Sequence, residues 1–496
     1  MTDPTFLGAG ELTAGYAAGD LSPVDVTLAV LERAAAIDAV VNAFVLIDAD
    51  GALDAAGESA ARWAAGSPLG PLDGVPASVK DILLQRGHPT LRGSAAIEPT
   101  GPFAEDAPSV ARLREAGCVL FGKTTTPEFG WKGVTDCPPH GATGNPYAPD
   151  RTAGGSSGGA AAAVAFGAGP MALGTDGGGS VRIPASFCGV FALKPTYGRV
   201  PLYPASAFGT LAHVGPMTRS AADAAALLDV IGRPDTRDWS HLGPPPAGYR
   251  AALEPPADTT PSHPLAGLRV AVSPTLSGPG DGPPVASAVA AAVRGAADLL
   301  AELGADVEEA DPPLGPVDEV LAAFETLWFS GAARATGPIR GTARERMDPG
   351  LREICAEGAR YSALDYLAAV DVRMALGREM GRFHERYDLL LCPTLPITAF
   401  GLGREVPEGS GLRRWTEWTP FTYPFNMTQQ PAASLPFGTD EEGLPIGVQL
   451  VAARHEDASV LRIAHAMELA GTPRIPPPAP PTADGTGGPA GRIRTA

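Results

Sequence analysis

Two serines, Ser156 and Ser180, lie within glycine-rich stretches of the chain, GGSSGG at 154–159 and TDGGGS at 175–180. Successive glycines allow neighbouring backbone amides to turn toward one point, and such amides can stabilise negative charge on an oxygen atom. Ser180 ends its glycine run, so we expect its hydroxyl to lie beside those amides. The stretch from Gly154 to Thr196 is therefore predicted to carry an active site.

Lys80, in the segment GVPASVKD, is a candidate base for these serines. A lysine held in an apolar strand loses hydration, which disfavours its charged form and lowers its pKa. A neutral amine can then accept a proton from a hydroxyl. For an isolated lysine an ordinary solvated side chain is the favoured interpretation, so this residue alone does not establish a site.

Two familiar motifs match the chain without the context that they need. Gly117–Thr124 (GCVLFGKT) fits the phosphate-binding formula GxxxxGK[ST], but its central residues are strand formers and Pro127 blocks the helix that should follow. Gly154–Gly158 (GGSSG) fits GxSxG, yet a loop and not a strand is predicted before it. The eight histidines, such as His88, His140 and His213, have no distinctive setting. Neither nucleotide binding nor a Ser-His-Asp triad is predicted.

Four segments in order, GVPASVKD, GKTTTPEFGW, GGSSGGAAAAVA and GTDGGGSVRIPASFCGVFALKPT, resemble the amidase signature family of serine hydrolases. The similarity extends over roughly residues 8–470, including PFNMTQQPAASLPFGTDEEGLPIGVQLVAARHED near the C-terminal end. The resemblance implies a Ser–cis-Ser–Lys triad. Ser180 matches the family's nucleophile, Ser156 the bridging serine whose preceding peptide bond is cis, and Lys80 the base.

The resemblance also implies roles for the residues around the triad. The amides of Gly177, Gly178, Gly179 and Ser180 would form the oxyanion hole. Ser157, Asp176 and Arg182 match positions that brace the catalytic loop, although a purely structural role for each remains open. Many relatives carry a larger residue in place of Gly177, so we expect a roomier loop here.

The substrate is only weakly indicated by the sequence. Trp131 and Gln429 match regions that line the substrate pocket in relatives, and an aromatic cluster could form a channel wall or simply fill the core: Trp415, Trp418, Phe421, Tyr423 and Phe425. If the cluster lines the channel, the expected substrate is an apolar or aromatic amide, anilide, oligoamide or carbamate.

Two other functions are weighed against a free-standing amidohydrolase. The amidase subunit of the tRNA-dependent glutamine amidotransferase resembles SIRQPA and SLDQIGP, where this chain has SVRIPA and TLAHVGP. Ile183 thus replaces a glutamine, which argues against that function. A catalytically inactive binding scaffold is disfavoured because all three triad positions are intact.

Composition limits the partners and the compartment. A formal net charge of −18 argues against nonspecific binding to nucleic acid or to anionic membranes. The five cysteines lack metal-binding spacing and fit buried, reduced thiols of a cytoplasmic protein. The resemblance implies no metal or organic cofactor, a small-molecule amide or carbamate as the partner, and leaves a homodimer open.

The hydrophobic pattern predicts an α/β protein. Helices are expected at 23–37, 107–116, 158–166, 221–231 and 285–304, and strands at 118–121, 171–174, 268–273 and 387–393. The resemblance implies the amidase-signature fold, a large mixed, mostly parallel sheet surrounded by helices. We predict one domain over 1–473, with a signature core at about 71–231, a proline-rich surface excursion at 232–264, and a disordered tail at 474–496.

Overall fold

The computed structural model describes residues 3–243, 245, 247–257, 259–276, 284–473 and 475–478. An 11-stranded sheet crosses this part of the chain in the order β1-β3-β2-β6-β8-β7-β12-β13-β11-β9-β10. A separate two-stranded sheet pairs β4 with β5. The strands are β1 Phe44–Ile47, β2 Pro76–Lys80, β3 Val119–Thr124, β4 Asp136–Cys137, β5 Gly141–Ala142, β6 Met171–Asp176, β7 Phe191–Lys194, β8 His213–Thr218, β9 Arg269–Val272, β10 Asp306–Glu309, β11 Leu389–Pro393, β12 Ala432–Thr439 and β13 Pro445–Val451.

Parallel pairing is concentrated in two blocks of the large sheet. Strands β3, β2 and β6 form one block, and β11, β9 and β10 form the other. The strands between the blocks, β8, β7, β12 and β13, pair antiparallel, as does β1 at one edge. The large mixed sheet surrounded by helices is confirmed. The predicted parallel pairing is present within each of the two blocks, whereas the strands that connect the blocks pair antiparallel.

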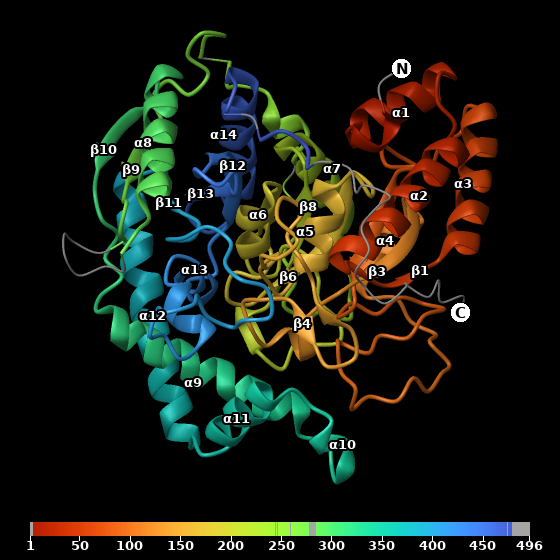
Figure 1. Ribbon diagram of the computed structural model, residues 1–496. Coiled ribbons are helices and arrows are strands. Elements are labelled where there is room, and N and C mark those ends of the chain that lie inside the picture. Colours follow the sequence, from red (N-terminus) through yellow and green to blue (C-terminus); the bar gives the residue numbers. More distant parts are fainter. Residues whose placement is uncertain are drawn as a thin grey trace.

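Helices surround this sheet (Figure 1). Helices α1, α2 and α3 lie near the β1 edge, α8 packs near β10 and β11 at the other, and α9 packs against α11 and α12. The α-helices are α1 Ala9–Ala18, α2 Pro23–Val41, α3 Ala49–Ala64, α4 Pro108–Glu115, α5 Gly158–Ala165, α6 Arg182–Cys188, α7 Ala221–Ile231, α8 Ser287–Glu302, α9 Val317–Thr336, α10 Thr342–Glu345, α11 Pro349–Gly358, α12 Ala363–Arg386, α13 Tyr423–Met427 and α14 Asp457–Ala470. Short 3₁₀ turns are η1 Pro4–Phe6, η2 Glu128–Gly130, η3 Gly209–Leu211, η4 Ala251–Leu253 and η5 Trp415–Trp418.

The local signals for helices and strands are confirmed. Ser22 caps α2 by accepting a hydrogen bond from the Val24 amide, and Pro23 occupies the first helical position. Helix α7 spans the predicted residues, α4, α5 and α8 end within two residues of their expected limits, and α2 continues past its expected end to Val41. The four predicted strands are also present, with small shifts at their ends.

The two misleading motifs are resolved as the sequence predicts. Strand β3 runs through GCVLFGKT, and Lys123 in that strand pairs with Asp81 at 2.7 Å, so this lysine is not presented by a phosphate-binding loop. The residues immediately before Ser156 form no strand and make only isolated bridges, at Arg151 and Thr152. The segment GGSSG is therefore not a nucleophile elbow.

Helix α5 is built from small residues because it packs closely on the sheet. All its residues are buried, and a Cβ at Gly159 would lie 2.4 Å from the Ala43 carbonyl oxygen and 2.6 Å from the Thr125 amide nitrogen. The surrounding stretch 152–175 carries no charged residue, and all of it except Thr175 is buried. Within the described ranges, no helix combines the length and apolar character needed to cross a membrane.

The five cysteines are all free and buried, as the sequence predicts. The proline-rich stretch at 232–264 contains only η4 as a regular element among its described residues. The single-domain assignment stays a prediction. The predicted disordered tail at 474–496 lies outside the described residues, apart from 475–478.

Replacing Gly159 with alanine is expected to lower the free energy of unfolding by about 1–3 kcal/mol, because the added methyl group meets backbone atoms that cannot move away. Gly57→Ala in α3 is the matched control. Its Cβ would meet nothing within 4 Å, and alanine favours the helix by about 1 kcal/mol. Urea unfolding should show opposite shifts for the two variants, and equal shifts would contradict this account of α5.

Candidate active site

The predicted site forms where parallel strands end and helices begin. Lys80 is the last residue of β2, and Thr175 and Asp176 end β6, its parallel neighbour. Carboxyl ends of parallel strands meet at one edge of a sheet, where α/β proteins place their ligands. Ser156 lies just before α5 and Ser180 just before α6. Segments far apart in sequence therefore converge at this edge.

The Lys80 side-chain nitrogen lies among three hydroxyl groups. Its Nζ is 2.7 Å from Ser156 Oγ, 2.9 Å from Ser157 Oγ and 2.9 Å from Thr175 Oγ1. The side chain is fully buried, and no carboxylate lies within ion-pair distance among the described residues. The lysine predicted as a base is thus joined directly to the serine predicted as its relay partner.

Burial lowers the pKa of Lys80 well below its ordinary value, and the negative charge of Asp176 only partly opposes this effect. A neutral amine donates two hydrogen bonds and accepts one. With three hydroxyls around it, one hydroxyl can donate its proton to Nζ, and Ser156 is the closest of the three.

Ser156 and Ser180 line the same cavity, which has a volume of about 330 Å³. Ser180 is 4% exposed, and its carbonyl oxygen accepts a hydrogen bond of 3.2 Å from the Ser157 amide. The Gly155–Ser156 peptide bond is cis, as the resemblance implies. A backbone hydrogen bond therefore holds Ser180 to the residue after Ser156, and both serines line one cavity.

One of the four amides predicted to form the oxyanion hole, that of Gly179, is already hydrogen-bonded within the protein. The Gly179 amide already donates a hydrogen bond of 2.8 Å to Asp176 Oδ1, so it is not free for an oxyanion. Hydrogen bonds from the amides of Gly177, Gly178 and Ser180 to other described residues are absent. The oxyanion hole thus stays a prediction for these three amides, and of these residues Gly177 and Ser180 line the cavity. The sequence could not show that the aspartate before the glycines would use the third of them.

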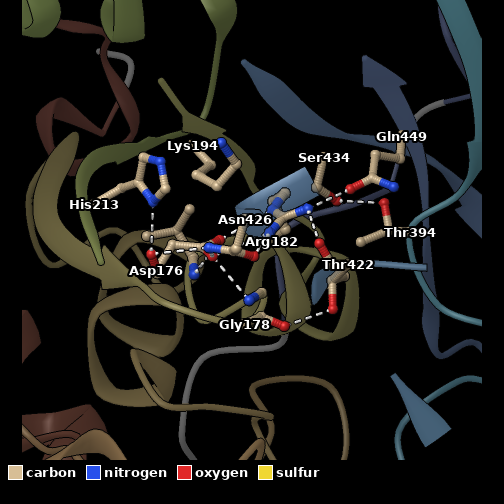
Figure 2. A network of polar contacts seen from close by, with 12 residues as sticks. Asp176, Gly178, Arg182, Lys194, His213, Thr394, Thr422, Asn426, Ser434 and Gln449 are labelled. Atoms are coloured by element: carbon tan, nitrogen blue, oxygen red, sulfur yellow. Dashed lines mark hydrogen bonds and ion pairs between the residues drawn. The ribbon is translucent and has the colours of Figure 1, made fainter. Parts of the chain in front are cut away.

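Asp176 and Arg182 form a buried ion pair with two parallel contacts, Arg182 Nε to Oδ2 at 3.0 Å and Nη2 to Oδ1 at 3.0 Å (Figure 2). Both side chains are fully buried. Asn426 Nδ2 adds a hydrogen bond of 2.8 Å to Oδ1. Although burial opposes ionisation, Arg182 and these contacts hold the pKa of Asp176 far below its usual value.

Arg182 also connects the glycine run to distant segments. Its guanidinium donates to the Thr422 carbonyl at 2.9 Å, to Gln449 Oε1 at 2.8 Å and to Asn426 Oδ1 at 2.6 Å. Thr422 in turn donates from Oγ1 to the Gly178 carbonyl at 2.7 Å (Figure 2). Asp176 and Arg182 therefore belong to a polar network that joins the glycine run to Thr422, Asn426 and Gln449, and their bracing role stays a prediction.

Trp328 changes the expectation for Gly177. A Cβ at Gly177 would lie 2.6 Å from the Trp328 ring, so the indole from α9 occupies the space that a larger residue would fill. Trp328 is itself stacked on Phe208, with ring centroids 4.0 Å apart. The loop is not roomier, because an aromatic side chain has taken the vacated volume.

The residues predicted to line the substrate pocket do not line the cavity at the two serines. Trp131 is fully buried in a hydrophobic core cluster, and neither it nor Gln429 lines the cavity that holds both serines. The five residues of the predicted aromatic wall are likewise absent from its lining and belong to the core. The apolar walls come instead from other residues: Ile82, Leu83, Phe129, Leu202, Tyr203, Phe208 and Trp328.

His213 lines the cavity but is not placed as a general base. Its Nδ1 donates toward two carbonyls, Leu211 at 2.8 Å and Asp176 at 3.2 Å, and burial lowers its pKa well below the ordinary value. No hydrogen bond joins its ring to Ser180 within the described ranges. This agrees with the rejection of a Ser-His-Asp triad.

Thr175 and Trp328 were not identified from the sequence. Thr175 stands beside Asp176 in TDGGGS, and strand alternation could have placed its side chain on the opposite side from that of Asp176. Nothing local marks Trp328, because its contact with Gly177 depends on how α9 packs against the loop.

Comparisons with known proteins find relatives over most of the chain. The amidase family model matches residues 25–461. An acylamidase of Rhodococcus erythropolis is 38% identical over 92% of this chain and 94% of its own length. A glutamyl-tRNA(Gln) amidotransferase subunit from Symbiobacterium thermophilum is 36% identical, covering 93% of this chain and 96% of its own.

Solved structures extend the comparison to the fold. A bacterial aryl acylamidase of the amidase signature enzymes superposes with a TM-score of 0.85 at 29% identity, covering 94% of this chain and 96% of its own. A 6-aminohexanoate cyclic dimer hydrolase in complex with its substrate also gives a TM-score of 0.85, at 30% identity, covering 96% of this chain and 100% of its own. The chain therefore belongs to the amidase signature family.

Proposed function

We propose that this protein is a serine amidohydrolase that cleaves an amide-type C–N bond through an acyl-enzyme on Ser180, with Ser156 and Lys80 as the proton relay. The observation that carries the proposal is the buried contact of 2.7 Å between Lys80 Nζ and Ser156 Oγ, beside a cavity that Ser180 also lines. The acylamidase relatives support the same reaction class.

In this mechanism neutral Lys80 takes the proton of Ser156 while Ser156 takes the proton of Ser180. The Ser180 oxygen forms a bond to the substrate carbonyl carbon, and the amides of Gly177, Gly178 and Ser180 stabilise the resulting oxyanion. The proton then returns through Ser156 to the leaving nitrogen, the C–N bond breaks, and the amine departs. Water attacks the acyl-enzyme along the same relay and releases the acid.

The apolar walls of the cavity favour a substrate with an apolar or aromatic body. Anilides and oligoamides fit this description, and the acylamidase and cyclic dimer hydrolase relatives are named for such amides. A carbamate is a further candidate, because the same attack and the same oxyanion apply to its carbonyl.

The amidotransferase subunit is the alternative, since relatives with that name are nearly as similar as the acylamidase. Ile183, which replaces a glutamine in that subunit's motif, disfavours it. Glutaminase activity that appears only with partner subunits would select this alternative. We also propose a cytoplasmic location, which the five buried free thiols support. A homodimer is a separate proposal.

Ser180→Ala is expected to reduce anilide hydrolysis by roughly a thousandfold or more, because the atom that forms the acyl-enzyme is removed. A sulfonyl fluoride should label Ser180, with the adduct located by mass spectrometry. Ser67→Ala, at an exposed serine, is the control and should keep full activity. Undiminished hydrolysis by Ser180→Ala, or labelling of Ser156 in its place, would refute the assignment.

The kcat/KM of the wild-type protein should rise with pH and then level off, because only deprotonated Lys80 can accept a proton. Since burial lowers the pKa of Lys80 well below its ordinary value, this rising limb of the pH–rate profile should occur at a lower pH than the titration of a free lysine. Lys80→Met should remove the limb and lower kcat about 100-fold or more.

The relevant measurement is a pH–rate profile at constant ionic strength. Thr175→Ser keeps a hydroxyl near Nζ and should retain the limb. An unchanged profile in Lys80→Met protein would show that another group is the base.

A further inference from the structure

The cavity that holds Ser156 and Ser180 carries an excess of positive charge. Three of its lining residues carry a formal charge near neutral pH, namely Arg92, Arg334 and Asp176. Asp176 is neutralised by its paired contacts with Arg182. The two arginines are left as the charges that a bound molecule would meet.

Neither arginine side chain has a direct partner in the described part of the chain. No hydrogen bond, ion pair or cation–π contact involves the guanidinium of Arg92 or that of Arg334. Most described arginines of this protein do have such partners, including Arg62, Arg182 and Arg199. Two guanidinium groups without a direct partner therefore line the same cavity.

The carboxylate that could have neutralised Arg92 is already engaged. Asp81 Oδ1 lies 2.7 Å from Lys123 Nζ, and its Oδ2 accepts a hydrogen bond of 3.4 Å from the Gly93 amide, so Asp81 acts on Arg92 only from a distance. Arg92 is half-buried, and its backbone has φ of +56°, a conformation that non-glycine residues rarely adopt. A half-buried cation without a contacting counter-ion, kept on a strained backbone, suggests a role in binding.

Arg334 is displaced from the reacting centre along α9. It follows Trp328, whose ring packs against Gly177, by six residues. At 1.5 Å per residue this separation is roughly 9 Å along the helix axis. Arg334 is exposed, so it lies where the cavity opens to solvent. A group bound there is thus several bonds away from a carbonyl held at Ser180.

We propose that Arg92 and Arg334 bind a carboxylate on the substrate, so that the preferred substrate is an amide whose apolar body ends in a carboxylate several bonds from the scissile carbonyl. This deepens the proposed function and rests on it. The planar guanidinium groups match a carboxylate in geometry and charge. The aromatic and aliphatic walls between them and Ser180 accommodate the apolar spacer.

The test compares adipic acid monoanilide with its methyl ester, which differ only in the terminal charge. Binding is measured by calorimetry in Ser180→Ala protein, where no hydrolysis interferes. We expect the acid to bind roughly 10- to 100-fold more tightly than the ester, and the difference to shrink in high salt. Arg92→Met and Arg334→Met should each reduce this preference.

Arg340→Met is the matched control, because Arg340 is likewise exposed, lies six residues beyond Arg334 and does not line the cavity. It should keep the full preference, and Arg92→Lys should keep part of it. Equal binding of acid and ester, or a preference that survives both Arg→Met changes, would overturn the proposal. Selective binding of the acid without hydrolysis by the Ser180 enzyme would support the carboxylate site and count against the proposed reaction.

Discussion

The buried pair of Asp176 and Arg182 is the interaction on which the rest of the site depends. Removing two charges from water is costly, and the cost is offset only when the charges meet with good geometry and their remaining hydrogen-bonding groups are satisfied. Here the guanidinium reaches Asp176, Thr422, Asn426 and Gln449, so that both conditions hold. The position of the glycine run depends on this pair, because Asp176 also accepts hydrogen bonds from the amides of Gly179 and Val181.

The contact with Arg182 distinguishes Asp176 from Lys80, the other buried ionisable group of the site. Asp176 remains ionised but is saturated by its partners, so it stabilises the loop and takes no proton from a serine. Lys80 is surrounded only by hydroxyls and is therefore poised to be neutral. Two equally buried groups thus differ because an opposite charge contacts only one of them: Arg182 holds the pKa of Asp176 low, whereas burial lowers the pKa of Lys80.

The sequence was most informative where chemistry and local structure coincide. Glycine spacing, the apolar strand before Lys80 and the Ser22 cap depend on neighbouring residues, and the corresponding elements are present. The predictions that the structure does not support concern the residues that line the cavity, and these depend on contacts between distant segments. Trp131 matches a region that lines the pocket in relatives, yet its side chain is in the core here. Trp328 and Arg334 line the cavity because α9 packs there, and no local pattern reports such packing.

The span of the Arg182 network has a consequence for how the chain acquires its structure. Lys80, Ser156 and Ser180 lie in the first half of the sequence, whereas Thr422, Asn426 and Gln449 belong to the last quarter. While a ribosome is still making the chain, the signature segments emerge long before the partners that satisfy Arg182. Until β13 joins the sheet, this guanidinium lacks its Gln449 partner and the loop lacks its outer support. The glycine run that ends at Ser180 therefore acquires its fixed surroundings only when nearly the whole chain has been made.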